Sequence, residues 1–191
     1  MSSENVDVKP KRPMPLYRKI LLAMLVVIAA FLGYVALQPS SFHVERSTTI
    51  NASPEKVFAE VNDFHRWDGW SPWLKLDPQA KTTFEGPESG DGAYFTWSGN
   101  ADVGEGSMKI TESKPYERIG IQLDFIKPFP GKSDVEFLFK TEGDKTKVTW
   151  GMSGQNGFIG RCFCTFMSMD KMIGDKYDEG LAKLKAIAES K

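Results

Sequence analysis

Two neighbouring stretches of alternating side chains decide the fold of this chain. Residues 134–140 read Asp-Val-Glu-Phe-Leu-Phe-Lys, and residues 147–152 read Lys-Val-Thr-Trp-Gly-Met. Between them the sequence Glu-Gly-Asp-Lys at residues 142–145 is typical of a turn. Apolar side chains at every second position predict two antiparallel strands that bury one face and expose the other.

The same period of two recurs earlier in the sequence. Residues 116–125 alternate, with Ile119, Ile121, Leu123 and Phe125 on one face, and residues 42–50 alternate as well. The stretch 86–106 holds six glycines, which mark turns between short strands. We therefore expect a curved antiparallel sheet of about seven strands.

Helix signals interrupt the strands at two places. Asn-Ala-Ser-Pro-Glu at residues 51–55 predicts a helix start, with Ser53 as N-cap, and Asp63 predicts a second, short helix through Trp67. From Phe158 to Glu189 apolar residues recur at intervals of three and four, which predicts one long helix across the sheet. Strands, short helices and a long terminal helix make an α+β fold.

The N-terminal forty residues have a different composition. Ile20–Leu37 is an 18-residue run without a charged side chain, close to the roughly 20 residues that cross a bilayer. We expect a cytoplasmic disordered tail at 1–15, a transmembrane signal-anchor helix at 16–38, a linker at 39–41 and one folded domain at 42–191. A cleaved signal peptide is the alternative, although no small-residue cleavage pattern follows the run.

Charge predicts the orientation of this helix. The near-neutral net charge of -1 divides into +3 for residues 1–19 and -4 for the remainder. Basic residues stay on the cytoplasmic side, so the N-terminus is expected inside and the domain outside. A domain of net charge -4 without a basic cluster is not expected to bind nucleic acid.

Aromatic side chains concentrate in the domain, which holds 20 of the 23 rings. We interpret the excess as the lining of a cavity between sheet and C-terminal helix, with a packed core as the alternative for each residue. Trp67 is interpreted as part of a packed corner. The predicted pocket residues are Trp70, Trp73, Phe95, Trp97, Met108, Leu123, Phe125, Phe137, Phe139, Trp150, Met152, Phe166, Met169 and Ile173.

Side chains that carry catalysis or bind metals are sparse. No nucleophile, zinc-protease or phosphate-loop motif occurs, and the two histidines, His43 and His65, lie far apart. Cys162 and Cys164 are two positions apart and would point in nearly opposite directions on a helix, so we predict no metal site and no cofactor. Glu105, between two glycines on a predicted strand, is the one carboxylate that we consider for catalysis.

Several motifs together resemble the SRPBCC superfamily, the helix-grip fold of START domains and birch-pollen allergens, in its bacterial polyketide cyclase/dehydrase-like branch. The resemblance runs from about Phe42 to Leu184 and rests on five segments. These are residues 46–58 (RSTTINASPEKVF), 63–67 (DFHRW), 70–73 (WSPW), 94–108 and 146–154. It implies the fold and a bacterial source, but the superfamily includes lipid carriers, cyclases, hydrolases and co-chaperones.

We therefore expect a domain anchored to the bacterial inner membrane, facing the periplasm, that binds an apolar or amphipathic small molecule such as a lipid or polyketide. One alternative is a cyclase- or dehydratase-like enzyme, which would need an inward general acid or base such as Glu105. Another is a co-chaperone-like interaction module with an exposed apolar patch.

Overall fold

The computed structural model describes residues 15–190, which divide into two compact units at the boundary between Gln38 and Pro39. The tail predicted for residues 1–15 lies almost wholly outside the described residues. The first unit is one helix, α1 (Leu16–Leu37). Within residues 15–190 it is the one helix long and apolar enough to cross a membrane.

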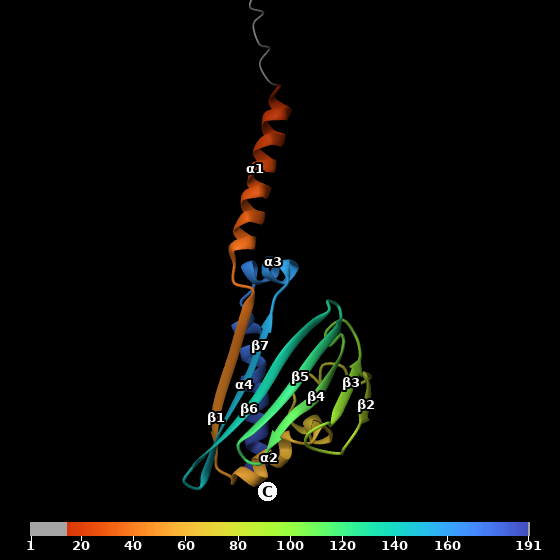
Figure 1. The fold of residues 1–191 in the computed structure, drawn as a ribbon, viewed down its shortest axis with the longest axis vertical. Helices are drawn as coiled ribbons and strands as arrows, with labels where there is room; N and C mark the ends of the chain where they lie inside the picture. The colour runs from red at the N-terminus through yellow and green to blue at the C-terminus, as the bar shows by residue number, and fades with distance from the viewer. Residues whose placement is uncertain (1–14, 191) are drawn as a thin grey trace, which may run out of the picture. The chain divides into compact units, whose positions relative to one another are not determined.

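The second unit is built on a seven-stranded antiparallel sheet, as predicted (Figure 1). The strand order is β1-β7-β6-β5-β4-β3-β2, so the first strand lies beside the last. The strands are β1 (Ser41–Ile50), β2 (Lys81–Glu85), β3 (Tyr94–Ser98), β4 (Glu105–Lys114), β5 (Arg118–Lys127), β6 (Gly131–Glu142) and β7 (Lys145–Gln155).

The alternating stretches behave as the period of two predicts. In β6, Val135, Phe137 and Phe139 are buried on one face, which we call the inner face. Val148, Trp150 and Met152 of β7 are buried beside them. The helices that follow β1 are also confirmed: α2 (Pro54–Val61) begins after Ser53, and the 3-10 helix η1 (Phe64–Gly69) begins after Asp63. The Asp63 carboxylate accepts a hydrogen bond from the His65 amide at 2.9 Å.

The prediction of one long helix from Phe158 is wrong, because the segment forms two helices. These are α3 (Phe158–Phe166) and α4 (Met169–Ser190). Met167 has extended backbone angles, φ -129° and ψ 129°, which interrupt the hydrogen-bond ladder. Ser168 then caps the start of α4, since its side-chain oxygen accepts a hydrogen bond from the Lys171 amide at 3.3 Å. The spacing of three and four continued through the break, so periodicity alone did not reveal it.

Helix α4 packs along β1 and covers the inner face of the sheet (Figure 1). Tyr177, Leu181, Leu184 and Ala188 form its buried stripe, as predicted. The Tyr177 ring stacks on Trp150 of β7, with centroids 3.9 Å apart and an 11° angle between the planes. Burial of this ring raises the pKa of the Tyr177 phenol well above its usual range.

Two glycines of α4 make this close approach possible. A Cβ atom at Gly180 would lie 2.8 Å from a ring carbon of Trp150, and one at Gly174 would collide with the Arg46 guanidinium. Glycine at these two positions lowers the helix propensity of α4, but it allows the helix backbone to contact the sheet directly.

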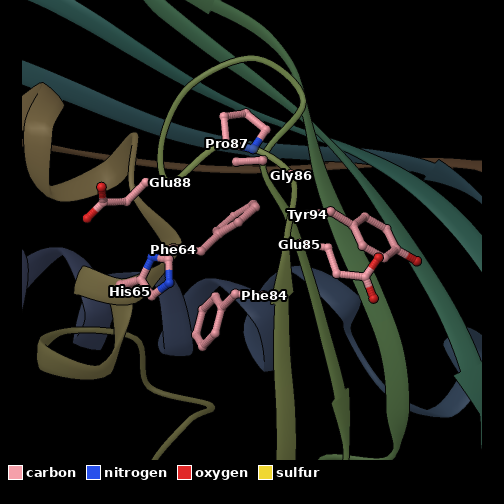
Figure 2. A pocket seen from close by; sticks show the side chains of 9 residues that line it. Phe64, His65, Phe84, Glu85, Gly86, Pro87, Glu88 and Tyr94 are labelled. Carbon is pink, nitrogen blue, oxygen red and sulfur yellow. The ribbon is translucent and has the colours of Figure 1, made fainter.

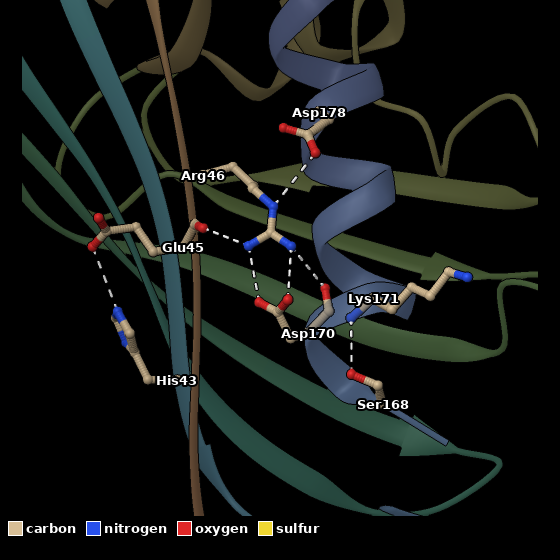
Figure 3. A network of polar contacts seen from close by, with 7 residues as sticks. All are labelled: His43, Glu45, Arg46, Ser168, Asp170, Lys171 and Asp178. Carbon is tan, nitrogen blue, oxygen red and sulfur yellow. Dashed lines mark hydrogen bonds and ion pairs between the residues drawn. The ribbon is translucent and has the colours of Figure 1, made fainter. Parts of the chain in front are cut away.

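An ion-pair network fixes the N-terminal half of α4 to β1 (Figure 3). Both terminal nitrogens of Arg46 donate to the Asp170 carboxylate at 2.9 Å, and its Nε lies 3.4 Å from Asp178. The hydrogen bonds from Arg46 hold the pKa of the Asp170 carboxyl below its usual range. The Arg46 guanidinium is therefore engaged by two carboxylates of α4.

We expect Gly180→Val to lower the free energy of unfolding by about 1–3 kcal/mol, because the added side chain forces Trp150 or Pro72 to move. Chemical denaturation measured by Trp fluorescence checks this. Ala182→Val is the matched control, since Ala182 is exposed two positions along the same helix and tests valine propensity alone. Equal losses in the two variants would contradict the packing explanation.

We expect Asp170→Asn to reduce stability near neutral pH and to lose this effect in acid. A carboxyl whose pKa is lowered in the folded state stabilises that state above its unfolded pKa, and the stabilisation disappears as pH falls through the folded value. Thermal unfolding of both proteins between about pH 2.5 and 7 measures the difference. Asp175→Asn, an exposed position on the same helix, is the control.

Candidate functional site

The centre of the inner face is filled by aromatic rings in mutual contact. Trp150 stacks against Phe137 at a centroid distance of 4.9 Å and meets the edge of Trp70 at 5.4 Å. Trp73 approaches the same indole edge-on at 5.7 Å. Four of the predicted pocket residues therefore come together here, as neighbours in a tightly packed group.

Trp67 and Trp70 form the packed corner between the short helices and the sheet. The Trp67 indole donates to the carbonyl of Val61 at 2.9 Å, and the Trp70 indole donates to the carbonyl of Glu60 at 3.1 Å. Both side chains are buried. Since these hydrogen bonds satisfy the two indole N–H groups, the rings are held in place as structural parts of the corner.

Packing loosens toward the end of the sheet where β1 begins, which we call the linker end. Along the inner face of β5, the exposed fraction is 0% at Ile119, 2% at Ile121, 9% at Leu123 and 38% at Phe125. Phe125 is the member closest to the linker end, because it pairs with Gly131 at the start of β6. The side chains of the core are therefore progressively less buried toward the linker end.

A set of incompletely buried apolar side chains lies at the linker end, and we call it the linker-end cluster. Phe42, Gly154, Ser133, Leu123 and Met108 form one row across five strands. Trp97, Gly106 and Phe125 form the next row, with the Trp97 and Phe125 rings 6.2 Å apart edge to face. The cluster consists of Phe42, Trp97, Met108 and Phe125, and we include Ile173 of α4, which is partly buried against the same core.

Small residues leave room beside these side chains. A Cβ atom at Gly131 would meet no atom within 4 Å, so this inner-face position beside Phe125 is open. At Gly154 a Cβ atom would meet the Phe42 ring at 2.7 Å, so that glycine lies beneath a ring. Open space therefore lies beside Phe125, whereas the Phe42 ring covers Gly154.

The predicted pocket residues thus separate into three groups. Trp97, Met108, Phe125 and Ile173 fall in the linker-end cluster, which also includes Phe42, a residue that the sequence interpretation did not select. Met169 is partly exposed in the first turn of α4, and Phe166 is 78% exposed on α3. The others are core residues: Trp70, Phe95, Leu123, Phe137, Phe139, Trp150 and Met152 are buried, and Trp73 is packed against them.

A separate, open pocket of about 280 Å³ lies between η1 and the β2–β3 hairpin (Figure 2). His65 stacks on Phe84 with centroids 4.1 Å apart, and its Nδ1 lies 2.8 Å from an Asp63 carboxylate oxygen. Its lining comprises Phe64, His65, Phe84, Glu85, Gly86, Pro87, Glu88, Ala93 and Tyr94, none of which the sequence interpretation selected. The volume lies just below the ~300–1,000 Å³ of typical small-molecule sites, and the two glutamates disfavour an apolar ligand.

Glu105, the carboxylate considered for catalysis, is the first residue of β4. The Lys127 ammonium lies 2.7 Å from its carboxylate, across the pair of strands β4 and β5. The ion pair lies at the surface of the sheet, because the Lys127 side chain is 71% exposed.

Comparison with known proteins identifies the family of the domain. The sequence profile of the family described as polyketide cyclase/dehydrase and lipid transport matches residues 41–189. The search of curated proteins gives no match.

Solved structures share the fold at low sequence identity. A protein from Chromobacterium violaceum is 15% identical, with a TM-score of 0.55 over 80% of this chain and 99% of its own. The Aha1 dimer from Colwellia psychrerythraea is 17% identical, with a TM-score of 0.56 over 78% and 96%. Ara h 8.0201 is 13% identical, with a TM-score of 0.55 over 79% and 99%.

At such identities these structures support the fold alone, and the profile match carries the assignment. The helix-grip arrangement predicted from the strand pattern, with the sheet wrapped on a C-terminal helix, is the arrangement that these structures share. The chain belongs to the polyketide cyclase/dehydrase and lipid transport family, a branch of the SRPBCC superfamily.

Proposed function

We propose that the domain binds an apolar or amphipathic small molecule at the linker-end cluster, and that α1 anchors the domain to a membrane. The family description, which includes lipid transport, supports hydrophobic ligand binding in general. The observation that carries the location is the thinning of the core from Ile119 to Phe125.

An apolar ligand is favoured at this place by the hydrophobic effect. Each methylene that moves from water into apolar surroundings contributes roughly 0.8 kcal/mol. Trp97, Met108 and Phe125 already expose apolar surface, so a ligand that covers them adds protein surface to the buried area. An acyl chain or a flat polyketide-like ring system is the ligand class that fits these contacts.

Binding there requires little disturbance of the core. The stacked group around Trp150 lies further along the sheet, in the row that also contains Arg46, and the row of Val44 and Met152 separates it from Phe42 and Gly154. The flexible thioether side chain of Met108 can adjust to ligands of different shape. The proposed site is therefore a permissive apolar surface, with few polar groups to select one ligand.

The membrane anchor is supported by the length and composition of α1. Its 22 residues extend about 33 Å at roughly 1.5 Å per residue, enough for a hydrocarbon core of about 30 Å. Arg18 and Lys19 stand at its N-terminal end, and Gln38, Pro39 and Ser40 follow it without a charge. This asymmetry favours a cytoplasmic N-terminus and a periplasmic domain at the bacterial inner membrane.

We expect the full-length chain, with its N-terminus intact, in the membrane fraction of an expressing bacterial cell. Carbonate extraction should leave it there, and intact-mass measurement should include residues 1–37. A shortened chain in the soluble periplasmic fraction would show that the segment is a cleaved signal peptide.

We expect a diazirine-bearing palmitic acid to crosslink the linker-end cluster of the full-length protein in liposomes. Peptide mapping should place adducts in β4, β5 and the first turns of α4. Gly131→Trp should reduce this labelling at least tenfold, because the ring enters the open space beside Phe125 without displacing backbone.

Lys132→Trp is the matched control, since the neighbouring position of the same strand points to the opposite face. It should retain the labelling of the parent protein, and both variants should keep its unfolding temperature. Equal labelling in the two variants, or adducts confined to α1 and α3, would exclude a ligand site at the cluster.

A further inference from the structure

Helix α3 exposes its apolar face and turns its polar face toward the protein. Ile159, Phe163 and Phe166 are 66%, 56% and 78% exposed, and Phe158 is 41% exposed. At 100° per residue these four side chains lie within one arc of about 140°. Cys162 lies within this arc and is less exposed, and Gly160, Arg161, Cys164 and Thr165 on the remaining surface of the helix are less exposed as well. A surface helix of a soluble domain has the reverse arrangement.

The helix is attached at the linker end of the sheet (Figure 1). Ser41, the first residue of β1, pairs with Gln155 of β7, and the amide of Asn156 donates to the carbonyl of Ser40 at 2.6 Å. Phe158 begins α3 two residues later. The start of α3 is therefore fixed beside the point where the chain enters the domain.

A second apolar segment reaches the same end. The tip between β5 and β6 exposes Ile126 and Phe129, at 49% and 65%. The pairing of Ser133 with Gly154, and of Gly154 with Phe42, places this tip at the linker end. The opposite end of the sheet has a polar turn, Glu142-Gly-Asp-Lys145.

We propose that α3 and the β5–β6 tip insert into the interfacial layer of the bilayer that holds α1. The proposal rests on the membrane anchor proposed above and not on ligand binding. Three residues, 38–40, separate α1 from β1, so the linker end stays within about 14 Å of the end of the anchor. A bilayer is thus always within reach of these apolar side chains, and interfacial helices bury such faces about 5–10 Å deep.

Insertion would connect the membrane to the linker-end cluster. Phe125 of the cluster directly precedes Ile126 of the tip in the chain. An apolar molecule that leaves the bilayer beside α3 would therefore meet the cluster without first crossing water.

Spin labels on the full-length protein in liposomes of phosphatidylcholine and phosphatidylglycerol test the proposal. In a background with Cys162→Ser and Cys164→Ser, which removes both native cysteines, single labels are placed by Ile159→Cys and by Phe163→Cys. Val27→Cys reports on the anchor, and Asp144→Cys reports on the polar end of the sheet. Collisions with oxygen and with a water-soluble nickel chelate are measured for each label.

Labels at 159 and 163 should collide at least threefold more with oxygen, relative to nickel, than the label at 144. Nickel collision at 159 and 163 equal to that at 144 would overturn the proposal, because the apolar face then lies in water. Shielding of 159 and 163 from both reagents would also overturn it, since a protein then covers the face. Lipid-like values at 27 in either case leave the anchor intact, whereas aqueous values at 27 reject the anchor itself.

Discussion

The stack of Tyr177 on Trp150 is the contact on which the rest of the domain depends. It joins the long helix α4 to the centre of the sheet at a centroid distance of 3.9 Å, and Gly180 leaves the space that it needs. The Trp150 indole also contacts the rings of Phe137, Trp70 and Trp73. Strand β6 and the segment that follows η1 therefore pack on the same side chain as α4. The Arg46–Asp170 ion pair holds the N-terminal end of α4 against β1.

This centre of packing lies away from the linker end, where we propose that a ligand binds. Rings that contact one another on several sides leave no room for another molecule, whereas Phe125 and its neighbours lack partners on part of their surface. The densest packing and the proposed binding site thus lie at different positions along one apolar face. The open end is also the end from which α3 and the β5–β6 tip project apolar side chains.

Most of the fold could be predicted because it rests on local patterns. Alternation at residues 134–140 and 147–152 predicted β6 and β7, and Ser53 and Asp63 correctly marked two helix starts. The continuous helix from Phe158 was the error, since Met167 breaks it while the spacing of apolar residues continues. The cluster was only partly foreseen: periodicity identified Trp97 and Phe125 as inward, but not which inward residues stay exposed.

Composition, periods of two and 3.6, and motifs were enough to predict the apolar N-terminal helix, a sheet of about seven strands, the inward face of the alternating stretches and the family. Only the tertiary structure decided that Trp70 and Trp150 are core while Met108 and Phe125 lie at an open end. It also decided that the apolar face of α3 points outward. Burial depends on what lies opposite a side chain, and those neighbours come from residues distant in the sequence.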